Sequence, residues 1–336
     1  MANYEIRLLG EDEFPLWNEF VSHSPQGTLF HKTNWLKASR ETPIIYGCFK
    51  SGRLVAGLPL VQRNIQFGMK TASHPPLTPY LGLVFKPARG KYVTQISAEK
   101  AMGKAIARSI KTDFNMIHFN FPPGPVDLQP FIWEGFYSSI RYTYLLSLDD
   151  LVQVWAGMDD KRRNDICRAE RDGLHVDNQS EFEEFFTLVR QTFQRQEIRM
   201  EFVDTAFHYN DMLEKRNQCR PFVTRDKDGI PIAGVYIIWD TRRAYYLLGG
   251  YNSVRTHRGA SALAMWEAIK FTKEELQLSQ FDFEGSMIPQ VEQFFRGFGG
   301  RLTPYYSVTF MRPAFKVALY LKQEIHGILE RFGVQI

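Results

Sequence analysis

Apolar residues recur at helical spacing in two long segments of the second half of the chain. In residues 180–193 the apolar positions fall on one face of a helix, namely Phe182, Phe185, Phe186, Val189 and Phe193. Ser180 and Glu183 have the spacing of a capping box, which predicts that the helix begins there. Residues 260–275 are apolar almost all round, so we expect that helix to be buried.

The order of helix and strand patterns repeats in the two halves. Each half reads as helix, hairpin, strand, helix and strand. The first set lies at residues 11–21, 44–63, 77–85, 97–111 and 115–121. The second set lies at residues 180–193, 219–240, 244–252, 260–275 and 280–285. This repeat predicts an internal duplication of one α/β unit, with the join near residue 145.

The last segment, residues 313–333, is basic and amphipathic. Its apolar stripe consists of Leu321, Ile325, Ile328, Leu329 and Phe332. Such a stripe most often packs on its own protein, and we expect this of the C-terminal helix (312–336). Peripheral contact with a membrane is the alternative interpretation.

Composition and charge narrow the class of protein. The chain has 336 residues, of which 44% are hydrophobic, enough for about two domains. The net charge of +4 comes without a basic block, so we expect no DNA partner. Three widely spaced cysteines (Cys48, Cys167 and Cys219) argue against disulfides and against a metal site. No signal peptide pattern or membrane-spanning run appears, so we expect a cytoplasmic protein.

Residues 281–300, FDFEGSMIPQVEQFFRGFGG, read as a short strand, a turn, an amphipathic helix and a glycine stop. Arg296 stands in the last turn of that helix. A basic residue there complements the negative end of the helix dipole. A guanidinium in this position can equally hold an anion with its planar fork of donors.

Four stretches of the second half together resemble the FemAB-like branch of the GNAT acyltransferase superfamily. They are KRRNDICRAERDGLHV (161–176), YYLLGGYNSVRTHRGASALAMWEAIK (245–270), FDFEG (281–285) and FFRGFGG (294–300). In the first half, NWLKAS (34–39) and LTPYLGL (77–83) are also similar to the family. The resemblance implies two tandem GNAT-like domains, 1–145 and 146–311, each a mixed, mostly antiparallel sheet flanked by helices. It also implies that the C-terminal helix, 312–336, packs back on the first domain.

The resemblance also implies an N-acyltransferase that acts on an amine of a cell-envelope precursor, either peptidoglycan or polysaccharide. The donor is an acyl-CoA in some relatives and an aminoacyl-tRNA in the FemAB enzymes proper. The acceptor is a small, lipid-linked or nucleotide-linked precursor. Two alternatives stay open: an aminoacyl-tRNA-dependent peptidoglycan-bridge transferase in the strict sense, and a binding protein without catalysis on a duplicated GNAT scaffold.

Several site residues follow from the resemblance. Arg296 stands where the family usually has a Lys, and is expected to stabilise charge in the transition state. Lys37, in Trp35-Leu36-Lys37, matches a family Lys that contacts the acceptor's nucleotide diphosphate. Tyr80 lies in the family-like stretch 77–83 and is expected to bind substrate.

The loop 253–261 lies between a strand and a helix, where the family holds the pyrophosphate of CoA. Arg255, Arg258, Gly259 and Ala260 are the expected contacts, although Thr256 occupies a position that is usually Gln or Arg. A basic loop that caps the following helix is the alternative interpretation. On the preceding strand, Tyr246 and Tyr251 can hydrogen-bond a substrate or pack in the core.

Two acidic residues are candidates for the general base. Asp282 and Glu284 end a strand and alternate with Phe281 and Phe283, so one of them can point into a cleft. The arginines of the helix near residues 161–171 alternate with acids, which favours a solvated helix face over a binding site.

Overall fold

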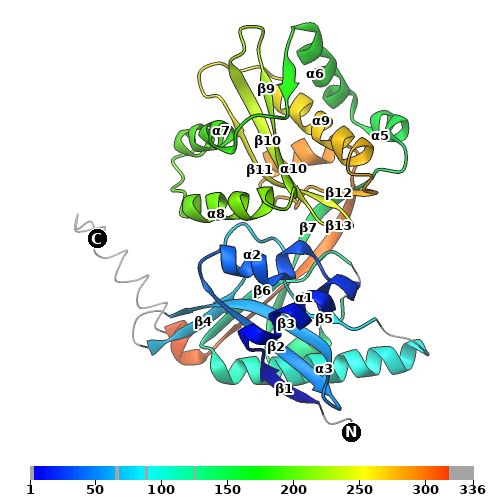
Figure 1. Ribbon diagram of the computed structural model, residues 1–336, viewed down its shortest axis with the longest axis vertical. Helices are drawn as coiled ribbons and strands as arrows, with labels where there is room; N and C mark the ends of the chain where they lie inside the picture. The colour runs from blue at the N-terminus through cyan, green and yellow to red at the C-terminus, as the bar shows by residue number, and fades with distance from the viewer. Residues whose placement is uncertain (1–3, 65–67, 88–89, 125, 318–336) are drawn as a thin grey trace, which may run out of the picture. The chain divides into compact units, whose positions relative to one another are not determined.

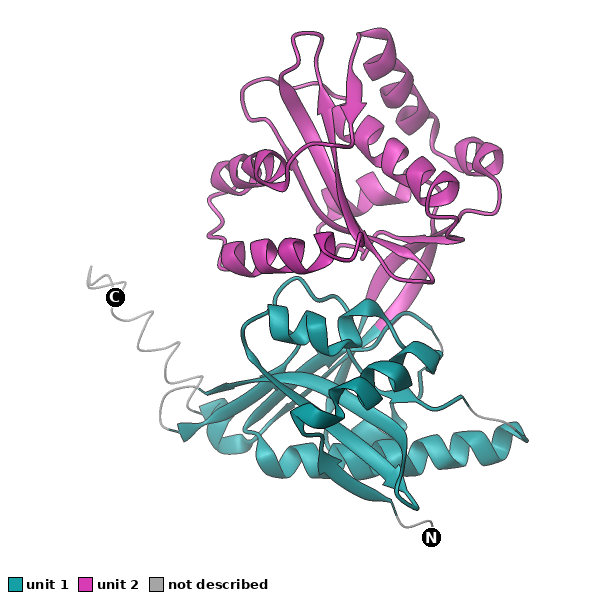
Figure 2. Cartoon of the chain, in the orientation of Figure 1, with its two compact units in different colours: residues 1–140, 306–336 teal, residues 141–305 magenta. Residues whose placement is uncertain are grey.

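The computed structural model describes residues 4–64, 68–87, 90–124 and 126–317 of the chain (Figure 1). The chain divides into two compact units (Figure 2). The first unit contains residues 1–140 and 306–336, and the second contains residues 141–305. The first unit is therefore assembled from two separate segments of the chain.

The first unit begins with a short strand and helical segments, continues with a hairpin, and ends with a long helix and further short elements. The helical segments are η1 (Glu11–Glu13), α1 (Phe14–His23), η2 (Leu29–His31), α2 (Thr33–Ala38), α3 (Tyr92–Asp113) and α4 (Gln129–Trp133). The strands are β1 (Glu5–Leu8), β2 (Thr42–Lys50), β3 (Arg53–Asn64), β4 (Lys70–Ser73), β5 (Val84–Phe85) and β6 (Met116–Asn120).

The sheet of the first unit has the order β1-β2-β3-β4-β6-β13, in which β13 is Arg301–Met311, and β5 pairs with β3. The strand pairs are antiparallel except for β4 and β6, which run parallel because the long helix α3 connects them. Ser51 and Gly52, at the turn between β2 and β3, both have positive φ, at 49° and 72°. Two successive residues of this kind give the tight turn that suits a two-residue hairpin.

The second unit contains most of the remaining elements. Its helices are α5 (Leu151–Gly157), α6 (Asp160–Arg171), α7 (Phe182–Arg195), α8 (Val203–Glu214), α9 (Ala260–Glu274) and α10 (Pro289–Arg296). Its strands are β8 (His175–Asp177), β9 (Cys219–Arg225), β10 (Pro231–Trp239), β11 (Ala244–Tyr251) and β12 (Gln280–Asp282). Two strands cross the boundary between the units, β7 (Tyr137–Ser147) and β13 (Arg301–Met311).

The sheet of the second unit has the order β7-β12-β11-β10-β9-β8. Only β11 and β12 are parallel, and they pair over two positions, Ala244 with Phe281 and Tyr245 with Asp282. Helices cover both faces of the central strands (Figure 1). Along β10, Gly234 and Tyr236 face α7, whereas Val235 and Ile237 join the apolar cluster that contains α9. This explains why β10 is a continuous apolar run.

Several expectations about the elements are confirmed. The chain is a mixed α/β protein, both hairpins form, and α9 has ten buried residues, as its apolar sequence predicts. The strand, helix and glycine stop in residues 281–300 are also confirmed, because α10 ends at Arg296 with Gly297 as its C-cap.

Other expectations are wrong. The helix predicted from residue 180 begins at Phe182, its N-cap is Glu181, and Ser180 makes no cap because its hydroxyl donates to Asp177. Residues 77–85 are not one strand, since only Val84–Phe85 forms a strand there, and the unpredicted strand β4 also pairs with β3. The predicted C-terminal helix begins in residues 313–317, and most of it, with its docking or membrane contact, lies outside the described residues.

Candidate functional site

The loop between β11 and α9 satisfies much of its own backbone. Asn252 Oδ1 accepts hydrogen bonds from the amides of Val254 and Arg255, each at 2.9 Å. His257 Nδ1 accepts from the amide of Gly259 at 3.1 Å. A pyrophosphate cradle of the expected kind needs amides that are open to the ligand. In this loop, three of the amides already have partners.

The basic side chains of the same loop are paired with acids. Arg255 Nη1 lies 2.6 Å from Asp226 and 3.1 Å from Asp228, in the turn between β9 and β10. Arg258 Nε lies 2.9 Å from Asp165 Oδ1 in α6. Both arginines are nevertheless about half exposed. Arg255 therefore ties the loop to the turn of the β9–β10 hairpin, whereas Arg258 ties it to α6.

Gly259 and Ala260 serve the packing of two helices. A Cβ at Gly259 would overlap the carbonyl oxygen of Asp165 and would also crowd Ala169 in α6. Ala260 is buried, and Thr224 Oγ1 donates to its carbonyl at 2.9 Å. The small residues at the start of α9 thus allow the close approach of α9 to α6, a packing role that the sequence interpretation did not consider.

A cavity of about 410 Å³ lies between α6, α10 and Arg258. Its basic lining residues are Lys161, Arg162, Arg258 and Arg296, and its acidic ones are Asp159 and Asp165. Gln290 and Gln293 add amide groups. An excess of cations in a concave polar site favours an anionic ligand. Of the residues predicted from the sequence, Arg258 and Arg296 meet here.

Arg296 is well placed to reach a ligand. Its side chain is 61% exposed, and its Nε lies 3.1 Å from Glu292 Oε1, one helical turn earlier. The Tyr144 hydroxyl donates to the same carboxylate. Burial raises the pKa of Tyr144 to about 12, and its bond to Glu292 adds to the shift. Tyr144, Glu292 and Arg296 therefore form a chain of contacts, in which the Glu292 carboxylate holds the guanidinium of Arg296.

Asp282 and Glu284 occupy the end of β12. Asp282 Oδ1 accepts from Thr143 Oγ1 at 2.7 Å and from the Glu284 amide at 2.9 Å. Arg243 Nη1 lies 3.8 Å from the other Asp282 oxygen. Asp282 is fully buried and is held as an acceptor, so it fixes the backbone of the strand end.

Glu284 differs from Asp282 in its surroundings. Its backbone has φ +56°, in the left-handed region that non-glycine residues seldom adopt. Its Oε1 is buried and has no hydrogen-bond partner among the described residues. Burial raises the pKa of Glu284 well above its ordinary value, and the charge of Asp282 raises it further. A buried, strained carboxyl with a perturbed pKa is a functional candidate.

Tyr246 and Tyr251 lie in different surroundings. The Tyr246 ring packs edge-on against Phe295 of α10 at 5.0 Å, and its hydroxyl occupies the space where a side chain at Gly249 would lie. Burial raises the pKa of Tyr246, and the nearby charge of Glu284 adds to this. Tyr251 instead lies under the guanidinium of Arg195 in α7, 4.2 Å from its ring centroid. Tyr246 thus lies near Glu284 in the candidate site, whereas Tyr251 packs against Arg195 of α7.

The two candidates of the first unit are Lys37 and Tyr80. Lys37 pairs with Glu11 at 2.7 Å and lies 4.8 Å from the ring of Phe14, with about half of its side chain exposed. Tyr80 is fully buried and meets Phe30 edge-on. The structure therefore places Lys37 at the surface and Tyr80 in the core of its unit.

The sequence interpretation missed part of the cavity. Arg162 and Asp165 were expected on a solvated helix face, and this is wrong, because their side chains are only 12% and 7% exposed. Arg168 and Arg171 of the same helix are exposed as expected. The sequence feature that could have identified Arg162 is the aromatic pair Phe294 and Phe298. Their ring centroids lie 4.4 Å and 5.3 Å from its guanidinium.

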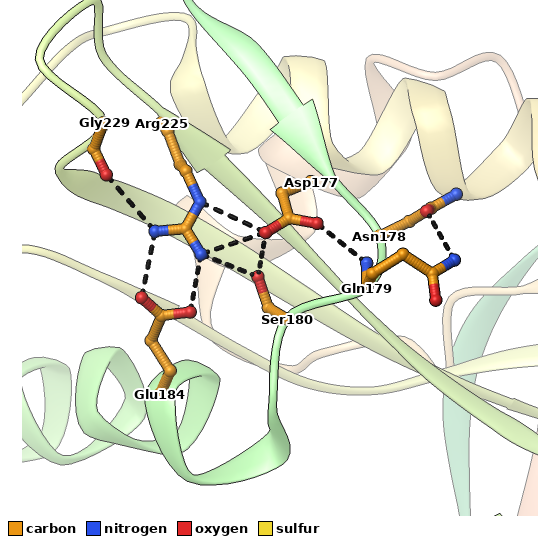
Figure 3. Close-up of polar contacts among 7 residues, drawn as sticks. All are labelled: Asp177, Asn178, Gln179, Ser180, Glu184, Arg225 and Gly229. Carbon is orange, nitrogen blue, oxygen red and sulfur yellow. Dashed lines mark hydrogen bonds and ion pairs between the residues drawn. The ribbon is translucent and has the colours of Figure 1, made fainter.

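Arg225, in the same unit, shows how a structural arginine is satisfied (Figure 3). Its guanidinium makes two bonds to Glu184, at 2.9 Å and 2.6 Å, and two to Asp177, at 3.2 Å and 3.0 Å. It also donates to Ser180 and to the carbonyl of Gly229. All three nitrogens are occupied, so this group ties β8, α7 and the β9–β10 turn together rather than binding a ligand.

Neither a metal cluster nor a membrane span appears in the described ranges. In those ranges no group of three or more His, Cys, Asp or Glu residues gathers in a way that could hold a metal ion. No described helix combines the length and the apolar character that crossing a bilayer requires.

Comparison with known proteins identifies the domain that holds these groups. Residues 160–296 match the acetyltransferase (GNAT) domain family. This range includes α6, the loop before α9, Glu284 and Arg296. No curated protein matches the chain.

Solved structures with the same fold cover nearly the whole chain. FemX matches with a TM-score of 0.67 and 13% identity, over 90% of this chain and 96% of that one. A tandem GNAT protein from the clavulanic acid biosynthesis pathway matches with a TM-score of 0.54 and 15% identity, over 92% and 98%. L-PGS from Bacillus licheniformis matches with a TM-score of 0.54 and 12% identity, over 95% and 97%.

These matches agree with the resemblance seen in the sequence. At such low identity the solved structures establish the fold, while the family match establishes the transferase domain. Residues 160–296 therefore match an acetyltransferase (GNAT) domain, and the chain has a fold similar to those of FemX and a tandem GNAT protein.

Proposed function

We propose that this protein transfers an acyl or aminoacyl group to an amine of a cell-envelope precursor, of peptidoglycan or of polysaccharide. The proposal joins the transferase domain to the similarity in fold with FemX and L-PGS. The acceptor is a small, nucleotide-linked or lipid-linked molecule that carries a primary amine. We place the reaction in the cytoplasm, where such precursors are assembled.

One observation carries the proposal: Glu284 Oε1, just after β12, is buried and has no hydrogen-bond partner among the described residues. β12 pairs with the parallel strand β11 at Ala244 and Tyr245, and burial together with the charge of Glu284 raises the pKa of Tyr246, the next residue of β11. An amine must lose a proton when it attacks a carbonyl carbon. Glu284 is the proton acceptor in this proposal, because a carboxylate with a raised pKa is a stronger base than an ordinary one.

Arg296 stabilises the negative charge that develops in the reaction. The carbonyl oxygen of the acyl group becomes negative as the new C–N bond forms, and a fixed guanidinium stabilises that charge. Contacts connect the two groups. The Tyr144 carbonyl accepts from the Phe283 amide at 3.1 Å, and the Tyr144 hydroxyl reaches Glu292, the partner of Arg296. Arg296 and Glu284 are thus supported by the same residue.

The atoms and charges of the reaction balance with the donor, the acceptor and Glu284 alone. The amine nitrogen bonds to the acyl carbon, and the bond from that carbon to the sulfur or oxygen of the donor breaks. The proton from the nitrogen passes to Glu284 and then to the leaving group. In this proposal Lys37 holds the nucleotide diphosphate of the acceptor, as an exposed ammonium group can do.

The donor is an acyl-CoA or an aminoacyl-tRNA. One observation favours the second: the loop 252–259 uses the amides of Val254, Arg255 and Gly259 for its own bonds. A CoA pyrophosphate held in the usual way would have to displace them. We therefore give aminoacyl-tRNA as the second, stricter candidate for the donor.

The test is a transfer assay with the purified chain. Acetyl-CoA or a mixture of aminoacyl-tRNAs serves as donor, a UDP-linked muropeptide as acceptor, and mass spectrometry detects the modified amine. We expect a product with one donor class and a loss of about 100-fold or more in rate for Glu284→Gln. Thr143→Val serves as a control for damage to the strand end. If Glu284→Gln reacts at the wild-type rate, the proposed base is wrong.

A further inference from the structure

The Arg162 side chain is only 12% exposed, and little of its hydrogen-bonding capacity is used. Its Nη1 lies 3.5 Å from Asp165 Oδ2, and its Nη2 donates to the Phe294 carbonyl at 3.4 Å. Both distances are at the long limit for hydrogen bonds. Its Nε is buried and has no hydrogen-bond partner among the described residues. Arg225, by contrast, fills all three nitrogens with closer contacts (Figure 3).

The position of Arg162 is nevertheless fixed. Phe294 and Phe298 lie against its guanidinium, at 4.4 Å and 5.3 Å from their ring centroids. A Cβ at Gly297 would lie 3.2 Å from its Nε, so the glycine leaves the space that the guanidinium occupies. Burial lowers the pKa of Arg162, although the nearby carboxylates of Asp165 and Asp159 oppose this. The side chain is held in place by rings and backbone rather than by strong ion pairs.

The cavity around Arg162 has an excess of positive charge. Four basic side chains line it against two acidic ones. Asp165 is shared between Arg162 and Arg258, and Asp159 caps α6 by accepting from the Lys161 amide at 2.8 Å. The acids that line the cavity therefore do not neutralise Lys161, and Arg296 pairs with Glu292, which does not line it. A buried arginine of this kind is stabilised when a phosphate supplies bidentate acceptors.

We propose that the cavity between α6 and α10 binds a phosphate group of the acyl donor, with Arg162 as the fixed anchor and Lys161 at the rim. The proposal rests on the proposed acyl transfer, because it names where the donor's phosphate lies. It moves the anion from the start of α9, where Gly259 packs on α6, to the neighbouring cavity. Phosphate of two origins has this chemistry: the pyrophosphate of CoA and the phosphodiester of an RNA 3′ end.

The test measures binding directly and needs no transfer. The full chain is titrated by calorimetry with inorganic pyrophosphate, with CoA and with an RNA minihelix that ends in single-stranded CCA. We expect Arg162→Gln to weaken binding at least 10-fold and Lys161→Gln to weaken it about 3-fold. Arg168→Gln is the matched control, since Arg168 lies on the same helix, is exposed and does not line the cavity. It should bind within twofold of wild type.

The ligand arms identify the source of the phosphate. If CoA and pyrophosphate compete and Arg162→Gln weakens both, the anion is that of a nucleotide donor. If the RNA binds, the slope of log affinity against log salt should fall by about 0.7 in Arg162→Gln, as expected for one lost single-strand contact. Lys161 is exposed, so Lys161→Gln keeps the test valid even if Arg162→Gln fails to fold.

The two proposals fail in different ways. Anion binding that Arg162→Gln and Lys161→Gln leave unchanged, or no binding of any of the three probes, overturns the anion site. That result says nothing about catalysis, which the transfer assay tests separately. Anion binding that depends on Arg162 in a protein without transfer would support the site and count against the catalytic proposal.

Discussion

Gly259, just before α9, lies so close to Asp165 in α6 that any Cβ at position 259 would overlap the Asp165 carbonyl oxygen. The obstacle is backbone, which cannot turn aside as a flexible side chain can. The glycine in this loop is thus explained by helix packing. The same contact brings Asp165 within reach of Arg258, so packing and the lining of the cavity depend on each other.

We expect Gly259→Ala to destabilise the protein by at least about 2 kcal/mol, the size of effect that overpacking a tight contact produces. Urea unfolding of the purified variant measures it. Gly157→Ala is the control, because a Cβ at Gly157, in α5, meets no atom within 4 Å. That substitution should be neutral or slightly stabilising. Equal effects of the two substitutions would contradict the packing role of Gly259.

Arg225→Ala should lower the free energy of unfolding by about 2 kcal/mol. The substitution leaves Asp177 and Glu184 without their shared partner, and both are partly exposed, which moderates the loss. Lys270→Ala, which removes a surface pair with Glu267, should cost under about 0.5 kcal/mol. Chemical denaturation of both variants makes the comparison, and similar losses would mean that the Arg225 cluster is not a structural clamp.

Stability should fall with rising pH on account of Glu284. Burial and the charge of Asp282 raise its pKa in the folded state above the ordinary value of 4.5. The folded state therefore holds this proton more tightly than the unfolded state. The stabilisation is complete below the unfolded pKa and is lost as the pH rises through the folded pKa.

Glu284→Gln removes this titration and keeps the shape of the side chain. We expect the variant to gain stability relative to wild type as the pH is raised from 4 to 9, with the difference smallest at the acid end. Unfolding curves at a series of pH values measure the difference. A constant difference across the range would show that Glu284 has the same pKa in both states.

Arg296→Ala should separate activity from stability. We expect transfer to fall about 100-fold, the size of effect seen when one oxyanion donor is removed. The free energy of unfolding should change by less than about 1 kcal/mol, because the side chain is 61% exposed and its pair with Glu292 is a surface one. Arg296→Lys should restore part of the rate. Undiminished transfer in Arg296→Ala would leave the residue with only its role at the helix end.

Local patterns in the sequence predict elements whose stabilising partners are near in the chain. The hairpin at Ser51 and Gly52, the buried helix α9 and the end of α10 are of this kind. The strand β4 is four residues long and polar at its start, so it has no pattern of its own. Pairing with β3 and β6 creates it. Ser180 looked like a helix cap, yet Asp177 and Arg225 take its hydroxyl.

The candidate site also contains residues that the sequence predicts and one that it does not. Arg296 and Glu284 could be named from the sequence, because a helix end and a strand end mark them. Arg162 could not, because the rings that hold it lie far along the chain, at the end of α10 and just after it. Phe294, whose carbonyl also accepts its hydrogen bond, is 132 residues further along. The charge alternation along α6 is typical of a solvated face. Only the fold shows that Arg162 turns inward.

The first unit receives its last strand from the far end of the chain. β13 pairs with β6, so that Thr309 lies opposite His118, 191 positions earlier. During synthesis the first unit therefore waits for β13 until the ribosome has passed residue 311. The second unit is continuous over residues 141–305 and lacks this delay. Once the second unit has folded, the loop that β6 and β13 must close becomes far shorter than its sequence length. Folding of the second unit thus lowers the entropic cost of completing the first.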